Sequence, residues 1–174
     1  MRITEKLVSF VKDWESLHDG DLSTIGLEPK LDASDDPIWT EGYGKAIVVN
    51  GKFARLSKYP TLESVLPYSI VRTEEQAIIL LRSELEKFAD GVNKRLEVCV
   101  CQSAFDSLVS HAYNCGYSET MYILINSQVD EGRIKEWYEN HYITAGGERL
   151  RGLVQRRKDE YRMRIKGIYE RTQL

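Results

Sequence analysis

Residues 37–53 of the chain read PIWTEGYGKAIVVNGKF, and this stretch does most to decide which fold the sequence can adopt. Residues 37–40 and 45–49 are rich in β-branched and aromatic residues, which indicates extended strands. Asn50 and Gly51 lie between Ala46-Ile-Val-Val49 and Lys52-Phe-Ala-Arg55, and this dipeptide is typical of a two-residue hairpin turn because both of its residues accept positive φ. The stretch therefore predicts a small antiparallel sheet.

The sequence on either side of this sheet has helical spacing. Apolar residues recur at helical spacing over residues 3–14, with Thr4 as the expected N-cap, and again from residue 73 almost to the end of the chain. Thr73-Glu-Glu-Gln76 predicts a capping box at the start of a long helix. Later helices are expected to begin at Cys101 and end near Gly116, and to cover about residues 119–130, 133–141 and 149–170.

These patterns predict an α+β, mostly helical fold formed by a single domain, residues 1–174. We expect a small antiparallel sheet lobe over about residues 18–70 and a larger helical lobe over about residues 71–174. The N-terminal helix, residues 3–15, should end where the chain enters the sheet lobe. A cleft is expected between the two lobes.

The composition is that of a soluble globular protein. The 174 residues are 42% hydrophobic and 29% charged, and no stretch approaches the roughly 20 apolar residues that a membrane span needs. Charged residues, including Glu5 and Lys12, interrupt the apolar residues of the N-terminus, unlike the apolar region of a secretory signal. We therefore expect the protein to be made and held in a cytoplasm.

Charge is distributed unevenly along the chain. Residues 133–174 carry eleven Lys and Arg against six Asp and Glu, although the net charge of the whole chain is −3. Such a segment can attract nucleic acid or a cell-wall polymer, but more often it is the solvated face of helices. The second interpretation is favoured, because no nucleic-acid-binding motif is present.

Three cysteines, Cys99, Cys101 and Cys115, do not have the spacing of a disulfide framework. A metal site that uses the Cys-x-Cys pair and His111 is the alternative, but structural zinc sites show wider spacing and four ligands. We expect three reduced, buried thiols that pack as small hydrophobic residues, with no metal and no cofactor.

Glu15 is a candidate proton donor. It closes the first predicted helix, beside Trp14, and both the negative end of the helix dipole and apolar surroundings would raise the pKa of a carboxyl group there. A carboxylic acid that stays protonated near neutral pH can protonate a leaving group, as glycoside hydrolysis requires together with a second carboxylate. The position alone would also fit an exposed glutamate.

The sequence contains four blocks in order, namely residues 30–44, 73–85, 102–116 and 145–157, and together they resemble the phage lysozymes of glycoside hydrolase family 24. In that family a glutamate closes the first helix, and a Tyr-Leu-Asp-like strand and then Trp-Thr-Ile-Gly-Tyr-Gly follow it. The strand is similar to Lys30-Leu31-Asp32 here, and the second motif is similar to Trp39-Thr40-Glu41-Gly42-Tyr43-Gly44. Its later helical segments are similar to three further blocks in the same order, namely residues 73–85, 102–116 and 145–157. The resemblance covers nearly the whole chain.

The resemblance implies a lysozyme-like fold and hydrolysis, without metal or cofactor, of the β-1,4 bond between N-acetylmuramic acid and N-acetylglucosamine in peptidoglycan. Glu15 would be the acid, Asp32 the second carboxylate, and Thr40 would help to hold the attacking water. Tyr43 and Asn114 are candidate substrate-binding residues. The expected role is that of a phage endolysin, a monomer released from the host cytoplasm to act on the wall, with no nucleic-acid partner and no membrane insertion.

The chain departs from the family's pattern at several positions. Glu15 and Asp32 are seventeen residues apart instead of about nine, which indicates an insertion near residues 18–28. Asp32 and Thr40 are eight apart instead of six, which two extra residues in the turn 33–36 would explain. Asp35 is therefore the alternative second carboxylate. Lys45 also replaces a histidine that follows the family's Gly-Tyr-Gly.

Two other functions remain open from the sequence. One is a catalytically silent wall-binding protein with the same fold, because a fold does not determine a function. The other is a helical interaction module, although such a module has no evident use for the hairpin 39–44. Retention of Glu15 and Thr40 favours the enzyme.

Overall fold

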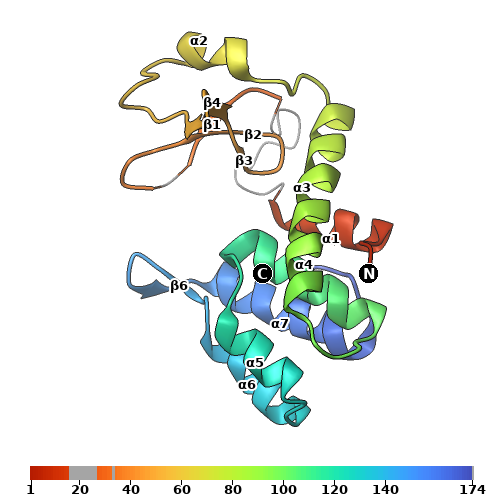
Figure 1. Cartoon of the computed structure of the whole chain (residues 1–174). Coiled ribbons are helices and arrows are strands. Elements are labelled where there is room, and N and C mark those ends of the chain that lie inside the picture. The colour runs from red at the N-terminus through yellow and green to blue at the C-terminus, as the bar shows by residue number, and fades with distance from the viewer. Residues whose placement is uncertain (16–26, 33, 174) are drawn as a thin grey trace. The chain divides into compact units, whose positions relative to one another are not determined.

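The structure is a computed structural model that describes residues 1–15, 27–32 and 34–173, and Figure 1 shows its elements. The chain forms two compact units. The sheet unit is Lys12–Ser83, and the helical unit combines Met1–Val11 with Glu84–Leu174. Helices α1 (Glu5–Glu15) and α3 (Glu74–Arg95) each contribute residues to both units, so the unit boundaries fall inside helices and not in linkers.

The sheet unit contains the predicted antiparallel strands. They are β1 (Lys30–Leu31), β2 (Trp39–Glu41), β3 (Lys45–Ala46), β4 (Val48–Val49) and β5 (Lys52–Phe53), in the sheets β1-β2-β3 and β4-β5. Asn50 and Gly51, with φ of 51° and 75°, form the predicted turn. The expected strand 45–49 is divided at Ile47, whose N–H donates to Trp39 while its carbonyl accepts from Ala54.

One apolar cluster forms the core around the sheet. It contains Trp39, Ile47, Val49, Ala54 and Val65. The indole N–H of Trp39 donates to the Tyr59 carbonyl at 2.7 Å, so the polar atom of this large side chain is also satisfied. Leu62 and Val65 of the short helix α2 (Leu62–Val65) contribute to this packing, and the 3-10 turn η1 (Leu66–Tyr68) follows directly; the sequence pattern predicted neither element.

The predicted N-cap residues are present, whereas the capping box predicted at Thr73 differs in its second hydrogen bond. The Thr4 hydroxyl accepts from the N–H of Leu7 at 3.2 Å, which confirms Thr4 as the N-cap of α1. At the start of α3 the Thr73 hydroxyl accepts from the N–H of Gln76 at 3.2 Å. The Gln76 side chain reaches back to the N–H of Arg72 at 2.7 Å, one residue before the N-cap.

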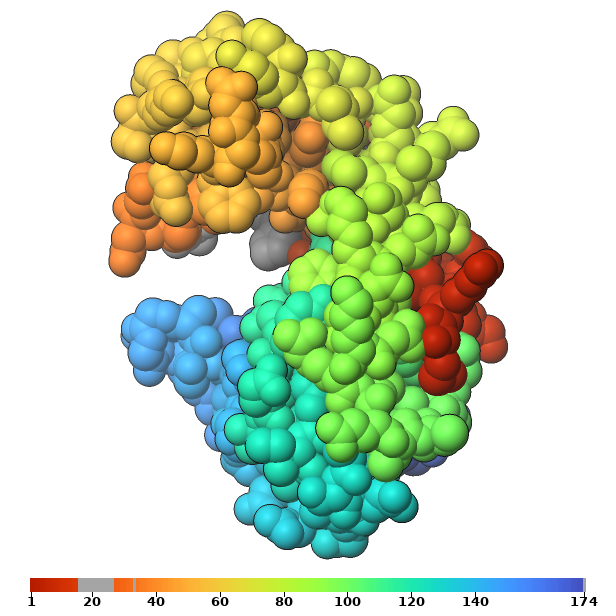
Figure 2. All heavy atoms as spheres, viewed as in Figure 1, coloured from red at the N-terminus to blue at the C-terminus, as the bar shows by residue number. Residues whose placement is uncertain are grey.

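The helical unit contains four further helices and one hairpin. The helices are α4 (Gln102–Cys115), α5 (Glu119–Asn126), α6 (Glu131–Asn140) and α7 (Arg151–Lys166). The hairpin joins β6 (Thr144–Ala145) to β7 (Glu148–Arg149) and projects from the helices of its unit (Figures 1 and 2). Helix α7 ends four residues before the predicted position, because Gly167 adopts a left-handed conformation with φ of 64°.

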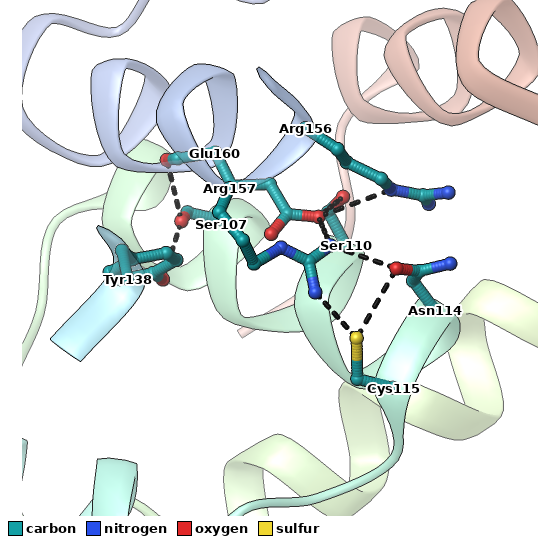
Figure 3. A network of polar contacts seen from close by, with 8 residues as sticks. All are labelled: Ser107, Ser110, Asn114, Cys115, Tyr138, Arg156, Arg157 and Glu160. Atoms are coloured by element: carbon teal, nitrogen blue, oxygen red, sulfur yellow. Dashed lines mark hydrogen bonds and ion pairs between the residues drawn. The ribbon is translucent and has the colours of Figure 1, made fainter. Parts of the chain in front are cut away.

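Buried charges hold α4 and α7 together (Figure 3). The side chains of Arg157 and Glu160 are fully buried, and the Glu160 carboxylate accepts from Arg157 at 2.9 Å and from the Ser110 hydroxyl at 2.8 Å. The Ser107 hydroxyl donates to the Glu160 carbonyl and lies 2.8 Å from the Tyr138 hydroxyl of α6. Arg156, the neighbour of Arg157, is also buried, so both arginines belong to the core of this unit.

The cysteines correct one expectation. All three lie in the described part of the chain and none forms a disulfide, but Cys99 and Cys101 are exposed and Cys115 is half-buried. The prediction of three buried thiols was wrong because Cys99 lies in the segment that joins α3 to α4, and Cys101 is the N-cap of α4 and not part of its apolar stripe.

In the part of the chain that the structure describes, no helix combines the length and apolar character needed to cross a membrane.

Candidate active site

The turn between β2 and β3 lies against the end of α1. Gly42 and Gly44 have positive φ, 56° and 84°, which glycine adopts without strain. A Cβ on Gly44 would lie 3.5 Å from Oε2 of Glu15, an ordinary contact distance, so the Glu15 carboxyl group lies directly beside this turn. Glu15 is therefore placed beside the hairpin that carries Thr40.

Asp32 and Thr40 lie on one face of the sheet β1-β2-β3. The register pairs Lys30 with Thr40 and Leu31 with Trp39, and the Asp32 N–H continues the ladder by donating to the Ile38 carbonyl at 3.0 Å. Because side chains alternate between faces, Asp32 and Thr40 share the face opposite to the buried Trp39. They are diagonal neighbours, whose separation is roughly 7 Å in such sheets.

The Asp32 carboxylate is held by hydrogen bonds that favour its charged form. Its Oδ1 accepts from the N–H of Ile38 at 2.9 Å and from the hydroxyl and N–H of Ser34 at 2.6 and 3.2 Å. Burial disfavours the charge, but these hydrogen bonds, with the nearby Arg55 guanidinium, outweigh it and lower the pKa of Asp32. Among the described residues, the hydrogen bonds to this carboxylate all reach Oδ1 and none reaches Oδ2.

The two candidate aspartates have different surroundings, because Asp35 lies within the turn that follows Asp32. Arg55 donates to the carboxylate and the carbonyl of Asp36, at 2.8 and 3.1 Å. Asp35 is exposed and makes no hydrogen bond or ion pair with the described residues. Ala33 lies outside the described residues, as does most of the insertion expected near residues 18–28. Arg55 was not singled out from the sequence, because nothing local connects it to a turn nineteen residues earlier.

The Thr40 hydroxyl uses its one proton in a hydrogen bond within the sheet. It donates to the Lys30 carbonyl of β1 at 3.1 Å, and the side chain is half-buried. A hydroxyl has one proton and two acceptor lone pairs. Its remaining capacity is therefore to accept a hydrogen bond, for example from a water molecule.

Tyr43 is a core residue of the sheet unit. Its side chain is 3% exposed, and its hydroxyl lies 3.5 Å from Oε1 of Glu74, which also accepts from Lys12 at 2.5 Å. Burial raises the pKa of Tyr43, so the phenol stays neutral. This position indicates that Tyr43 supports the hairpin against α1 and α3, and its expected contact with substrate stays a prediction.

Asn114 lies in the last turn of α4, in the helical unit. Its side-chain oxygen accepts from Arg157 at 2.9 Å and from the Cys115 thiol at 3.2 Å (Figure 3). Asn114 therefore joins the end of α4 to the buried charges of α7. Its expected contact with substrate also stays a prediction.

Glu41 is a structurally important residue that the sequence analysis did not single out. It is 5% exposed, and its Oε2 accepts from the Ser69 hydroxyl and from the N–H groups of Ile70 and Val71 at 2.7 to 3.0 Å. The carboxylate thus fixes the segment that leads into α3. The available signal was a charged residue in a strand position where the family motif has isoleucine.

No group of three or more His, Cys, Asp or Glu side chains in the described ranges is placed to hold a metal ion.

Comparison with known proteins gives the family. A sequence model described as Phage lysozyme matches residues 24–160, a range that includes Asp32, Thr40 and Asn114 but begins after Glu15. The chain is 39% identical over 101 residues to an endolysin of Bacillus phage B103. That alignment covers 56% of this chain but only 38% of the endolysin, so the chain spans well under half of the length of this relative.

Two solved structures are similar over almost their whole length. An endolysin from Escherichia coli O157:H7 phage FAHEc1 has 27% identity and a TM-score of 0.70, covering 98% of this chain and 97% of that chain. The muramidase domain of SpmX from Asticaccaulis excentricus has 25% identity and a TM-score of 0.62, covering 95% of this chain and 98% of that chain. These similarities confirm the predicted lysozyme-like fold, and the match over residues 24–160 shows that this chain belongs to the phage lysozyme family.

Proposed function

We propose that this protein hydrolyses the β-1,4 bond between N-acetylmuramic acid and N-acetylglucosamine in peptidoglycan, and that it acts as a phage endolysin. Membership of the phage lysozyme family supports the proposal, and similar proteins are named as endolysins and as a muramidase domain.

The observation that carries the proposal is the arrangement around the β2-β3 hairpin. Asp32 and Thr40 share one face of the sheet, and the Glu15 carboxyl group lies against the Gly44 turn of the same hairpin. Two carboxyl groups and a hydroxyl acceptor in one small region match the needs of glycoside hydrolysis, which uses an acid, a second carboxylate and a positioned water.

Each of the three residues has a distinct role in this mechanism. Glu15 protonates the glycosidic oxygen as the bond breaks. Asp32, whose pKa is lowered, remains an anion that stabilises the positive charge developing on the sugar and accepts a proton from the attacking water. Thr40 accepts a hydrogen bond from the same water, since its own proton is donated to Lys30. Attack by water on the face opposite to the leaving group inverts the anomeric carbon.

The proposal includes the protein's partner and place of action. The substrate is the bacterial wall, the protein acts as a monomer, and it stays in the host cytoplasm until it is released to the wall.

The test combines cell lysis with product analysis. Purified protein should reduce the turbidity of outer-membrane-permeabilised Gram-negative cells and release new reducing ends from isolated peptidoglycan. Product with N-acetylmuramic acid at the reducing end would support hydrolysis at the proposed bond. Wall binding without any release of reducing ends would contradict the proposal and indicate a silent wall-binding protein.

A further inference from the structure

Two adjoining hollows open on the surface of the helical unit, beside the segment that joins α3 to α4. Their volumes are about 420 and 390 Å³, within the range of small-molecule sites. Cys99, Val100, Glu131 and Arg164 line both hollows, and Cys101 lines the second. None of these residues belongs to the proposed glycan-cleaving site.

The guanidinium of Arg164 is held in this place with one donor group unused. Its side chain is only 9% exposed, and Nε and Nη2 donate to the Glu131 carboxylate at 3.2 and 2.7 Å. The third nitrogen, Nη1, is buried and has no hydrogen-bond partner among the residues that the structure describes. A buried unsatisfied N–H is unfavourable, and a carboxylate is the acceptor that a guanidinium binds best. Arg164 lines both hollows, so a carboxylate that enters them can bind its guanidinium in competition with Glu131.

Cys101 brings a reactive group to the same place. It is the exposed N-cap of α4, and its sulfur lies 3.4 Å from the Ser103 hydroxyl. The hydrogen bond with Ser103, the first amides of α4 and the charge of Arg164 lower the pKa of Cys101, against the opposing effect of burial. The thiolate, which these groups favour, is the form that attacks disulfides.

Cys99 provides an internal comparison. It is also exposed and lines both hollows, but it lies two residues before Cys101 and outside the helix terminus. A reaction that depends only on exposure would modify the two cysteines equally. A reaction that depends on the N-terminus of α4 and on Arg164 would favour Cys101.

We propose that this site performs thiol–disulfide exchange with a small disulfide that carries a carboxylate, with Arg164 binding the carboxylate and Cys101 attacking. The Cys101 thiolate attacks one sulfur, the S–S bond of the small molecule breaks, and a new S–S bond joins Cys101 to one half of it. The other half leaves as a thiolate and takes a proton from water. The small disulfide is the oxidant: Cys101 is oxidised and the departing half is reduced.

The first experiment treats the reduced full-length protein with oxidised glutathione and follows its mass, then maps the modified peptide. We expect one glutathione half on Cys101, added at least about fivefold faster than on Cys99 because the attacking species is the thiolate. Cys99→Ser should retain the fast modification and Cys101→Ser should lose it. Equal or faster modification of Cys99 would overturn the proposal.

The second experiment tests Arg164 with a pair of reagents. Oxidised glutathione carries carboxylates and hydroxyethyl disulfide carries none, so the ratio of their rates at Cys101 reports carboxylate binding. Arg164→Gln should lower this ratio by about three- to fivefold, as expected for one partly exposed ion pair. Glu131→Gln, which removes the competing carboxylate, should raise it, and this variant decides the question if Arg164→Gln does not fold. An unchanged ratio in the folded variants would overturn the role of Arg164.

Discussion

Asp32 in the sheet unit and Asp106 in the helical unit show how differently the two regions use a carboxyl group. Asp32 is half-buried, and three hydrogen bonds to its Oδ1 help to lower its pKa. Asp106 is fully buried, and burial raises its pKa although Thr4, Gln102 and Tyr169 donate to it. Both groups are well hydrogen-bonded, so the number of donors does not explain the difference.

The difference follows from what surrounds each carboxyl group. The hydrogen bonds of Asp106 connect the N-terminal segment, α4 and the C-terminal segment, and no part of the side chain is exposed. Glu160 of the same unit is likewise buried, between Arg157 and Ser110. Asp32 instead has one oxygen without a donor among the described residues. The buried carboxyl groups Asp106 and Glu160 therefore hold the helical unit together, whereas Asp32 is bonded through one oxygen only. Five predictions test this contrast.

The largest effect is expected at Glu15. Glu15→Gln should reduce the release of reducing ends by about a thousandfold, within the range that general acid catalysis contributes, because an amide cannot donate the proton. The midpoint of thermal unfolding should change little. Glu28→Gln, an exposed glutamate of the same unit, serves as the control and should behave like wild type. Activity of Glu15→Gln within a few-fold of wild type would remove Glu15 from the mechanism.

The next largest effect is on stability and lies in the helical unit. Glu160→Gln should lower the free energy of unfolding by about 3–5 kcal/mol, because the buried Arg157 would lose the carboxylate that compensates its charge. Glu139→Gln, in the exposed pair with Lys135 on α6, should lower it by less than about 1 kcal/mol. Urea denaturation measures both. Equal effects of the two substitutions would show that the buried network does not stabilise this unit.

The two candidate aspartates of the sheet unit form the third test. Asp32→Asn should reduce turnover by at least about a hundredfold, the scale of charge stabilisation lost from a transition state, whereas Asp35→Asn should leave it within about twofold. Asparagine keeps an oxygen that can accept from Ile38 and Ser34, so folding should be retained. The reverse order of effects would identify Asp35 as the second carboxylate.

The effect at Thr40 is expected to be of similar size or smaller. Thr40→Val keeps the β-branched shape but removes the group that would hold water, so turnover should fall by up to about a hundredfold. Loss of the hydrogen bond to Lys30 should lower the free energy of unfolding by about 1 kcal/mol. Wall pull-down and release of reducing ends are measured on the same variant. A parallel loss of binding and turnover would make Thr40 a binding residue.

The smallest effect is a pH dependence of stability with opposite signs in the two units. Asp32 should make its full contribution to the free energy of unfolding at pH values above 3.8, its ordinary pKa. This contribution should be lost as the pH falls through the lower pKa that Asp32 has in the folded protein. Asp106 should make its full contribution to the free energy of unfolding below pH 3.8. This contribution should be lost as the pH rises through the higher pKa that Asp106 has in the folded protein. Urea denaturation of wild type, Asp32→Asn and Asp106→Asn across this range measures each difference. The same sign for both would refute the contrast between the units.

Local signals in the sequence were sufficient for most of the secondary structure. The Asn50-Gly51 turn, the Thr4 and Thr73 caps and the end of α4 at Gly116 each depend on residues within a few positions, and all are present. The sequence also predicted the fold class and the family. It missed the short helix α2 and placed the end of α7 too late, because short elements and helix ends depend on weak local preferences.

The site depended on the tertiary structure to a much greater extent. The sequence by itself, through its resemblance to the phage lysozymes, indicated Glu15, Asp32 and Thr40 as acid, second carboxylate and water holder, and these roles stay predictions. Only the folded chain decided that Asp32 shares a sheet face with Thr40 and that Arg55 binds Asp36 at the end of the turn after Asp32. It also decided that Cys101 is exposed beside Arg164. Exposure, pKa and hydrogen bonding are set by neighbours distant in sequence, and no local pattern encodes those neighbours.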